Sequence, residues 1–168
     1  MRAALHNCQF EFPARHITVN LAPADLPKES GRFDLPIALG ILAASGQIPA
    51  NRLAEYEFAG ELALTGELRA IRGALAMTYH AANCGRAFML PVANAAEAAL
   101  VEQATVYAAK SLLQVAAHLS GREAISRFLP DAQPLEPHYP DMREVKGQGQ
   151  SKRALEVAAA GGHSVLMS

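Results

Sequence analysis

The clearest alternation of apolar and polar positions in the chain lies at residues 16–21, which read HITVNL. Apolar residues at every second position predict a half-buried strand. A nearly continuous apolar run follows at residues 35–44 and predicts a buried helix. Asp34 precedes this run as an expected N-cap, and Pro36 falls in the first turn, where a missing amide hydrogen costs nothing. We therefore expect a strand, a loop and a buried helix in this order.

Two shorter segments with strand-like patterns, residues 57–64 and 67–71, stand on either side of Thr65 and Gly66. This pair of residues favours a turn, so the two segments predict a hairpin. Beyond the hairpin, helical and strand-like patterns alternate. We expect helices at residues 73–83, 94–101 and 111–119, and short strands at residues 86–90 and 105–107. This order predicts an α+β fold with a mixed sheet covered by helices.

Composition divides the chain into three parts. Residues 1–120 hold the alternating helices and strands and are expected to form one domain. Residues 121–140 contain four prolines and are expected to form a linker, because proline removes a backbone donor and restricts the residue before it. Residues 141–168 return to a helix-forming pattern at 150–160 and a strand-like pattern at 164–167, which predicts the start of a second module.

The chain is close to electrically neutral, with 15 Lys and Arg against 16 Asp and Glu. This balance argues against a domain that holds nucleic acid by a large net positive charge, and it leaves a local basic patch as the alternative. The longest apolar run, residues 35–44, is shorter than the ~20 residues of a membrane-spanning helix. Cys8 and Cys84 are the only cysteines, too few for a disulfide framework, so we expect a cytoplasmic protein without a membrane partner.

Two side chains with metal-binding chemistry, His80 and Cys84, stand four residues apart on an expected helix. At this spacing two helical side chains are able to face one metal ion, but a structural zinc site needs four ligands. The nearest further candidates, His6 and Cys8, belong to another helix, so we predict ordinary packing and no metal site. Ser30 lacks the Gly-x-Ser-x-Gly setting of a hydrolase nucleophile.

Several segments resemble the ComM/YifB family. In the first domain they are residues 27–38 (PKESGRFDLPIA), 58–68 (FAGELALTGEL) and 71–75 (IRGAL). Near the end they are Asp141 and residues 145–148 (VKGQ), 152–155 (KRAL) and 158–167 (AAAGGHSVLM). Members of this family are catalogued as magnesium-chelatase-like and combine a Lon-protease-type domain with an AAA+ ATPase module. The resemblance implies this domain order for the whole chain apart from the linker.

The resemblance also gives the positions of the Ser-Lys dyad found in proteolytic Lon-type domains. Asp34 stands at the position of the nucleophilic serine, and Leu75 stands at the position of the activating lysine. A carboxylate offers no hydroxyl for attack, and an isobutyl side chain is no base. Peptidase activity is therefore not expected, and the domain is expected to serve as a structural or binding module.

The same resemblance implies that the chain is truncated at both ends: the first domain lacks its N-terminal part, and residues 141–168 end before the phosphate-binding loop of the ATPase. The segment expected to border the adenine consists of Val145, Lys146, Gly147 and Gln148. Because the amides, lysine and magnesium ligand of the loop belong after Ser168, no cofactor is expected for this chain. ATP and magnesium are expected for the full-length parent.

For function, the resemblance implies a hexameric ATP-dependent motor that processes DNA, with branch migration during natural transformation as its role. The basic residues nearest the dyad positions are then the expected phosphate contacts, namely Lys28, Arg32, Arg69 and Arg72. The alternative is a ring-assembly or protein-interaction module without DNA contact, which the near-neutral charge favours. A magnesium-chelatase subunit is a further alternative that rests on the catalogue name alone.

Overall fold

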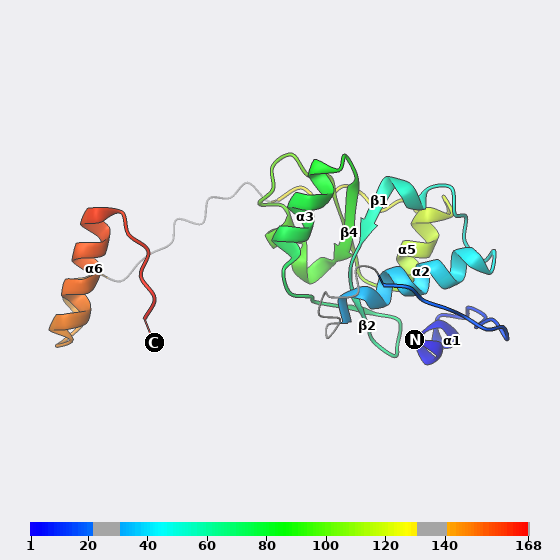
Figure 1. Cartoon of the computed structure of the whole chain (residues 1–168), viewed down its shortest axis with the longest axis horizontal. Coiled ribbons are helices and arrows are strands. Elements are labelled where there is room, and N and C mark those ends of the chain that lie inside the picture. Colours follow the sequence, from blue (N-terminus) through cyan, green and yellow to red (C-terminus); the bar gives the residue numbers. More distant parts are fainter. Residues whose placement is uncertain (22–30, 131–140, 168) are drawn as a thin grey trace. The chain divides into compact units, whose positions relative to one another are not determined.

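A computed structural model describes residues 1–21, 31–130 and 141–167. The chain divides into two compact units, Met1–Asp131 and Ala132–Ser168 (Figure 1). In the second unit the described residues form η4 (Met142–Glu144), a 3-10 helix, and α6 (Gly149–Gly161). None of the helices in the described ranges has the length and apolar character needed to span a membrane.

The first unit is built around a parallel three-stranded sheet in the order β1-β4-β5. Its strands are β1 (Tyr56–Phe58), β4 (Ala87–Pro91) and β5 (Val106–Ala109). Successive side chains of β4 point to opposite faces, so Phe88 and Leu90 belong to one apolar core and Met89 belongs to another. Burial on both faces is typical of parallel sheets and explains why β4 is apolar throughout.

Helices cover both faces of this sheet (Figure 1). The core on the Met89 face receives side chains from α1 (Arg2–Asn7), α2 (Asp34–Ala44) and α5 (Leu112–Leu119). The opposite core receives side chains from α3 (Ala74–Asn83) and α4 (Ala95–Ala98). Three 3-10 helices lie in the connections, namely η1 (Gly31–Phe33), η2 (Leu53–Glu55) and η3 (Val92–Asn94). The prediction of a mixture of helices and strands is confirmed.

The predicted hairpin is confirmed in a shorter form. Strand β2 (Glu61–Leu62) pairs antiparallel with β3 (Leu68–Arg69). Its turn contains Gly66 at a φ of +89°, a left-handed conformation that glycine adopts without a steric penalty. The described strands therefore form a parallel sheet and an antiparallel hairpin in place of one continuous sheet, and an antiparallel bridge between Tyr107 and Arg127 adjoins β5.

The expected strand at residues 57–64 is divided between these two sheets. The division falls at Gly60, whose N–H donates to the Arg32 carbonyl and whose carbonyl accepts from the Leu35 N–H, both at 3.0 Å. These bonds attach Gly60 to the start of α2 instead of to a neighbouring strand. One continuous strand was expected because the sequence pattern does not reveal this change of partner.

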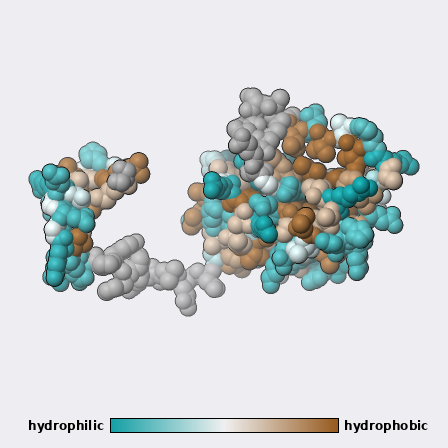
Figure 2. Space-filling model, turned by 90° about the horizontal axis from the view of Figure 1, so that it is seen from below, coloured by the Kyte–Doolittle hydropathy of each residue, from teal (hydrophilic) through white to brown (hydrophobic). Residues whose placement is uncertain are grey.

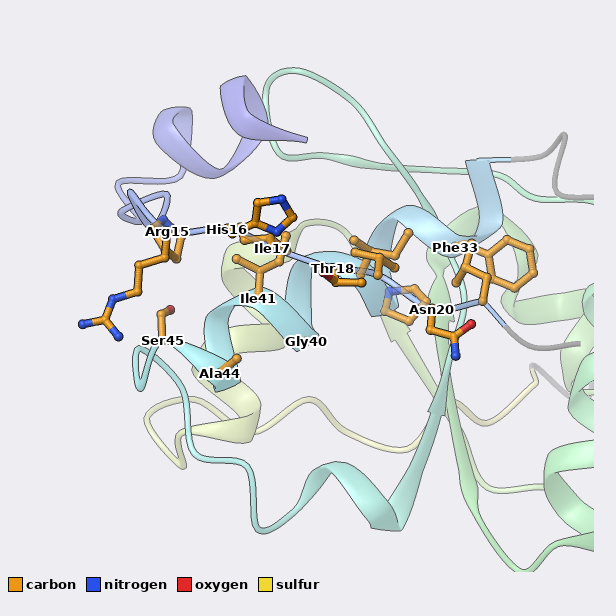
Figure 3. A pocket seen from close by; sticks show the side chains of 15 residues that line it. Arg15, His16, Ile17, Thr18, Asn20, Phe33, Gly40, Ile41, Ala44 and Ser45 are labelled. Atoms are coloured by element: carbon orange, nitrogen blue, oxygen red, sulfur yellow. The ribbon is translucent and has the colours of Figure 1, made fainter. Parts of the chain in front are cut away.

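The prediction of a strand at residues 16–21 is wrong, because the described structure has no strand there. These residues lie beside α2 (Figure 3), and no backbone hydrogen bond joins them to another described segment. Alternating side chains are only part of what a strand needs, since its backbone groups must also find a neighbouring strand. The expected strand at residues 164–167 likewise forms no ladder within the described part of the second unit.

The N-termini of the helices show which predicted N-cap residues form capping hydrogen bonds. Asp34 was expected as an N-cap but is the first residue of α2, with Phe33 at the cap position. The Ser111 hydroxyl accepts a hydrogen bond from the Gln114 N–H at 3.2 Å, as the capping signature of α5 predicts. Helices α3 and α6 begin and end within about two residues of their expected bounds, which is the usual uncertainty of helix ends.

The packed part of the first unit continues past residue 120. Ile125 is buried, and the Phe128 N–H donates to the Val106 carbonyl at 2.8 Å, so this stretch packs against β5. Residues 131–140, the remainder of the expected linker, lie outside the described residues.

Candidate nucleic-acid interface

Two of the predicted phosphate contacts, Arg32 and Arg69, lie at the same corner of the first unit. Arg32 belongs to η1, and Arg69 ends β3. A Cβ added to Gly31 would lie 2.6 Å from the Glu61 Cγ, and the Glu61 Oε1 lies 3.7 Å from the Arg69 Nη1. The absent side chain of Gly31 therefore permits η1 to approach β2 closely, and Glu61 connects the elements that carry the two arginines.

Arg72 extends from the loop between β3 and α3, and a buried asparagine holds this loop. The Asn94 side chain accepts from the Ile71 N–H and donates to the Ile71 carbonyl, both at 2.9 Å. Asn94 therefore does not cap α4 with its side chain as expected, and α4 ends at Ala98 instead of reaching residue 101. Arg72 itself is exposed, next to a backbone that two hydrogen bonds fix.

The three predicted phosphate contacts that the structure describes, Arg32, Arg69 and Arg72, differ in their ion-pair partners. The ion pair of Arg69 and Glu61 is exposed, with side-chain accessibilities of 67% and 42%, so it contributes at most about 1 kcal/mol. Arg32 and Arg72 form no ion pair with the described residues. Their charges are therefore not neutralised by a described carboxylate, and guanidinium groups bind phosphate oxygens with two donors at once. Lys28, the fourth predicted contact, lies outside the described residues.

A pocket of about 310 Å³ opens beside Arg32, at the edge of the parallel sheet formed by β1. It is lined by Arg32, Phe33, Glu57, Phe58, Ala59, Ala76, Met77, His80 and Phe88. The lining is mainly apolar, with a guanidinium and a carboxylate among it. No sequence motif marks this pocket, because its residues come from η1, β1, α3 and β4 and meet only in the fold.

Asp34 and Leu75, which the resemblance places at the positions of a Ser-Lys dyad, make separate contacts. The Asp34 Oδ2 accepts a hydrogen bond from the Leu62 N–H at 3.2 Å, which attaches the start of α2 to β2. Leu75 lies in the first turn of α3 with 42% of its surface exposed, and its N–H donates to the Glu97 Oε1 at 3.0 Å. Neither side chain supplies the hydroxyl or the neutral amine that acyl transfer by a Ser-Lys pair requires.

His80 and Cys84 face each other near the end of α3, with 3.6 Å between the His80 Nε2 and the Cys84 Sγ. Among the described residues, no three His, Cys, Asp or Glu side chains form a group that is able to hold a metal ion. We therefore assign the pair as a contact on an exposed helix end.

The four residues expected to border an adenine form an exposed turn in the second unit. Gly147 and Gln148 both have left-handed backbone, with φ of +73° and +51°. The Lys152 ammonium donates a hydrogen bond to the Val145 carbonyl, and Lys146 is exposed. Ligand pockets enclose most of their ligand, whereas an exposed turn buries little of it. The described part of this unit therefore does not enclose a nucleotide.

A buried polar network on the Met89 face of the sheet was not predicted from the sequence. The His118 Nδ1 accepts from the Ile125 N–H at 2.9 Å, so the neutral ring carries its proton on Nε2 and donates it to the Tyr56 Oη at 3.0 Å. The Arg52 Nη2 donates to the same oxygen at 2.7 Å. Burial lowers the pKa of His118, and the nearby Arg52 charge lowers it further. The available signal was helical spacing, because His118 follows the buried Val115 by three residues.

A larger hollow of about 830 Å³ is a groove between residues 13–21 and α2 (Figure 3). Helix α2 is apolar on all sides, so the side that does not face the core still presents Ile37 and Ala44 to this groove.

Comparisons with known proteins cover both units. The family model described as subunit ChlI of Mg-chelatase matches residues 1–94, and a second model, magnesium chelatase subunit ChlI, matches residues 141–168. The uncharacterized protein YifB of Salmonella typhimurium is 47% identical over 167 residues, which cover 99% of this chain and 33% of the relative. The competence protein ComM of Haemophilus influenzae is 46% identical over 171 residues, which cover 99% of this chain and 34% of the relative. The uncharacterized protein Mb2921c of Mycobacterium bovis is 34% identical over 169 residues.

The two matching models define the class as that of the ChlI-type, magnesium-chelatase-like proteins. The identities over nearly the whole chain are more specific, and the chain belongs to the ComM/YifB family. It spans about a third of the length of the curated relatives that it matches.

Proposed function

We propose that this chain is a non-peptidolytic Lon-type accessory domain, joined to the beginning of the ATPase module, of a ComM/YifB-type AAA+ ATPase that processes DNA. Family membership supports the ATPase class. The name of the ComM relative, a competence protein, supports a role in natural transformation. A motor that moves branches along incoming DNA needs a surface that guides the strands, and we assign this task to the first unit.

The observation that carries the proposal is the corner formed by η1, β3 and the loop before α3. Arg32 and Arg69 lie at this corner, and Arg72 follows Arg69 by three residues in the exposed loop before α3. Two carboxylates at the corner already have partners, because Glu61 pairs with Arg69 and Asp34 accepts a backbone amide. Of these three guanidinium groups only Arg69 pairs with a described carboxylate, and this supports phosphate contacts in a chain whose net charge is −1.

The proposed parent is a cytoplasmic hexamer that uses ATP and magnesium. These cofactors supply the phosphoryl-transfer chemistry that drives a motor. In this chain Lys146 and Gln148 lie in the exposed turn that borders the adenine in such modules. The groups that hold the phosphates and the magnesium belong to the phosphate-binding loop of the parent.

Binding of forked DNA to the 168-residue chain tests the proposal. Fluorescence anisotropy at about 50 and 200 mM salt measures how strongly the affinity depends on counterion release. With three phosphate contacts, we expect the logarithm of the affinity to fall with the logarithm of salt at a slope of about −2 to −3. No binding at the lower salt concentration, or binding that salt does not change, contradicts a phosphate-driven interface.

A second candidate function is ring assembly, and exposed apolar residues on α3 and after α4 favour it. Leu75, Tyr79 and Leu100 are 42%, 57% and 71% exposed and line one shallow hollow. Apolar residues are also visible on the surface of the first unit (Figure 2). Exposed apolar clusters are typical of protein interfaces. Sedimentation measures self-association of the chain. If the chain self-associates, loses this association in a Leu100→Ser variant and does not bind DNA, the results favour assembly over DNA guidance.

A further inference from the structure

The pocket beside Arg32 has aromatic walls. Phe88 lines the pocket from the core below α3, and the half-buried Met77 packs against that core, whereas the Phe58 side chain packs against the Met89-face core. Phe33 contributes a further ring from the end of η1. Rings that a folded core holds in place offer a flat apolar surface on which another ring stacks.

The Arg32 guanidinium lines this pocket and forms no ion pair with a described carboxylate. Its Nε is removed from solvent and has no hydrogen-bond partner among the described residues. The guanidinium carbon lies 4.9 Å from the centre of the Phe33 ring, and this cation–π contact holds the group against the aromatic wall. The charge of this guanidinium has no counter-ion among the described carboxylates, so a ligand that brings an anion to the pocket is favoured.

The lining of the pocket also includes an acceptor of fixed position. The Glu57 Oε1 accepts a hydrogen bond from the Arg86 Nη1 at 2.8 Å, and the Glu57 side chain remains 33% exposed. Carboxylates accept hydrogen bonds from the exocyclic amino groups of bases. The pocket therefore combines a stacking surface, a cation without a described carboxylate partner and a carboxylate acceptor.

We propose that this pocket takes one unstacked base of a single DNA strand, with the base against the aromatic wall and Arg32 bound to the adjacent phosphate. The proposal rests on the DNA-binding function proposed above and specifies single-stranded DNA as the form that the first unit holds. A volume of about 310 Å³ lies at the lower end of the range of about 300 to 1,000 Å³ for ligand pockets and suits one base. An aromatic side chain of a peptide fits the same walls but brings no anion to Arg32, so the observations favour a nucleotide.

The test compares two labelled strands of about 12 nucleotides, one of mixed sequence and one abasic, by fluorescence anisotropy with the 168-residue chain. Both strands carry the same phosphates, so a difference in affinity reports contacts to bases. We expect the mixed-sequence strand to bind at least about fivefold more tightly, because stacking of one base on aromatic side chains contributes at least this factor.

Two variants locate the preference in the pocket. Ala76→Leu narrows the pocket from an exposed position of α3 and is expected to reduce the preference to below about twofold, with the abasic strand bound as before. Ala96→Leu, at an exposed position of α4 that does not line the pocket, is the matched control and keeps the preference. Arg32→Gln is expected to weaken the binding of both strands and to reduce the slope of log affinity against log salt by about one. Arg122→Gln, at an exposed arginine outside the corner, is expected to leave the affinity and the slope unchanged.

The outcomes separate the two proposals. If neither strand binds, the DNA-binding function is overturned and the base pocket with it. If both strands bind equally and with salt dependence, DNA binding stands and the base pocket is overturned. A preference that survives Ala76→Leu also overturns the pocket assignment. An acidic peptide with one tyrosine provides a further test. If this peptide competes with the strands for the wild-type chain, and Ala76→Leu abolishes the competition but leaves the binding of both strands unchanged, the pocket is a peptide site and the proposal is overturned.

Discussion

The Asp34 carboxylate accepts a hydrogen bond from the backbone N–H of Leu62, with 3.2 Å between Oδ2 and N. This contact joins the first residue of α2 to β2 at the corner where Arg32 lies. The Lon-type resemblance assigns the same position to the catalytic nucleophile. In this chain the side chain at that position therefore contributes to the fold, and it supports the backbone that carries the proposed DNA contacts.

Replacing Asp34 tests this structural role. We expect Asp34→Ala to lower the free energy of unfolding of the first unit by about 1–2 kcal/mol, because it removes a charge-assisted hydrogen bond and a negative charge from a helix N-terminus. Asp34→Asn keeps an acceptor oxygen and is expected to cost less. Chemical denaturation followed by circular dichroism measures both, and an Asp34→Ala variant as stable as the wild type contradicts the assignment.

The chain is expected to show no peptidase activity toward unfolded casein. An Asp34→Ser variant is expected to be equally inactive, because Leu75 leaves the new hydroxyl without a base to activate it. Cleavage products are measured by gel electrophoresis and mass spectrometry. Casein cleavage by the pure wild-type chain that disappears in Asp34→Ala is the result that contradicts this prediction.

Gly66 allows the hairpin turn to pass close to α1. A Cβ at this position would lie 2.1 Å from the Cys8 Sγ, and the φ of +89° is unfavourable for other residues. We expect Gly66→Ala to destabilise the first unit by about 2–3 kcal/mol through overpacking and backbone strain. In a Cys8→Ala background the clash with sulfur is absent, so the same substitution is expected to cost less when Tm values are compared. If Gly66→Ala lowers the Tm equally in the two backgrounds, the close approach of Gly66 to the Cys8 sulfur is contradicted.

The buried imidazole of His118 makes the stability depend on pH. Its pKa is lowered in the folded chain, first by burial and then by the Arg52 charge, so below the ordinary value of about 6.5 the unfolded chain binds a proton that the folded chain does not. Stability is therefore complete above about pH 6.5 and falls as the pH decreases below it, by at most about 1.4 kcal/mol per pH unit. Urea denaturation between pH 7.5 and 5 measures this slope.

A substitution at position 118 provides the control for this pH dependence. His118→Gln is expected to flatten the pH profile, although it lowers the overall stability because its amide does not reproduce both ring hydrogen bonds. His16→Gln, at an exposed histidine, is expected to leave the profile unchanged. A pH profile of His118→Gln as steep as that of the wild type means that another group carries the dependence.

The 168-residue chain is expected to bind no ATP in calorimetry up to millimolar nucleotide. The turn formed by Val145 to Gln148 is exposed, and most of the affinity for ATP comes from the amides, lysine and magnesium ligand of a phosphate-binding loop. A longer chain that includes the complete ATPase module is expected to bind. Micromolar affinity in the 168-residue chain places the nucleotide site elsewhere.

Most helices of this protein were predictable from sequence because their signals are local, although α4 is shorter than expected and Asp34 and Asn94 do not cap their helices as expected. The capping pair Ser111 and Gln114 and the apolar spacing of α5 involve residues within about one turn of each other. The strands were less predictable, because a ladder depends on a partner far away in the chain. Residues 16–21 have a strong strand pattern without a described neighbour, and Gly60 bonds to the start of α2 and thereby ends β1 early.

The candidate site was predictable only in part for the same reason. The resemblance gave Lys28, Arg32, Arg69 and Arg72 as a set, and the structure describes the contacts through Glu61 that relate Arg32 to Arg69. The pocket beside Arg32 had no sequence signal, because its aromatic walls come from segments that meet only after the sheet and α3 have packed.

The salt dependence of DNA binding by an Arg69→Ala, Arg72→Ala double variant tests the proposed interface most directly. Each phosphate contact contributes about one to the slope of log affinity against log salt, so we predict a slope flatter by up to about 2 and weaker binding of every sequence alike. An Arg15→Ala, Arg122→Ala variant, which removes two exposed arginines outside the corner, is the matched control and is expected to behave as the wild type. An unchanged slope and affinity in the Arg69→Ala, Arg72→Ala variant contradict DNA contact at this corner and favour the assembly function.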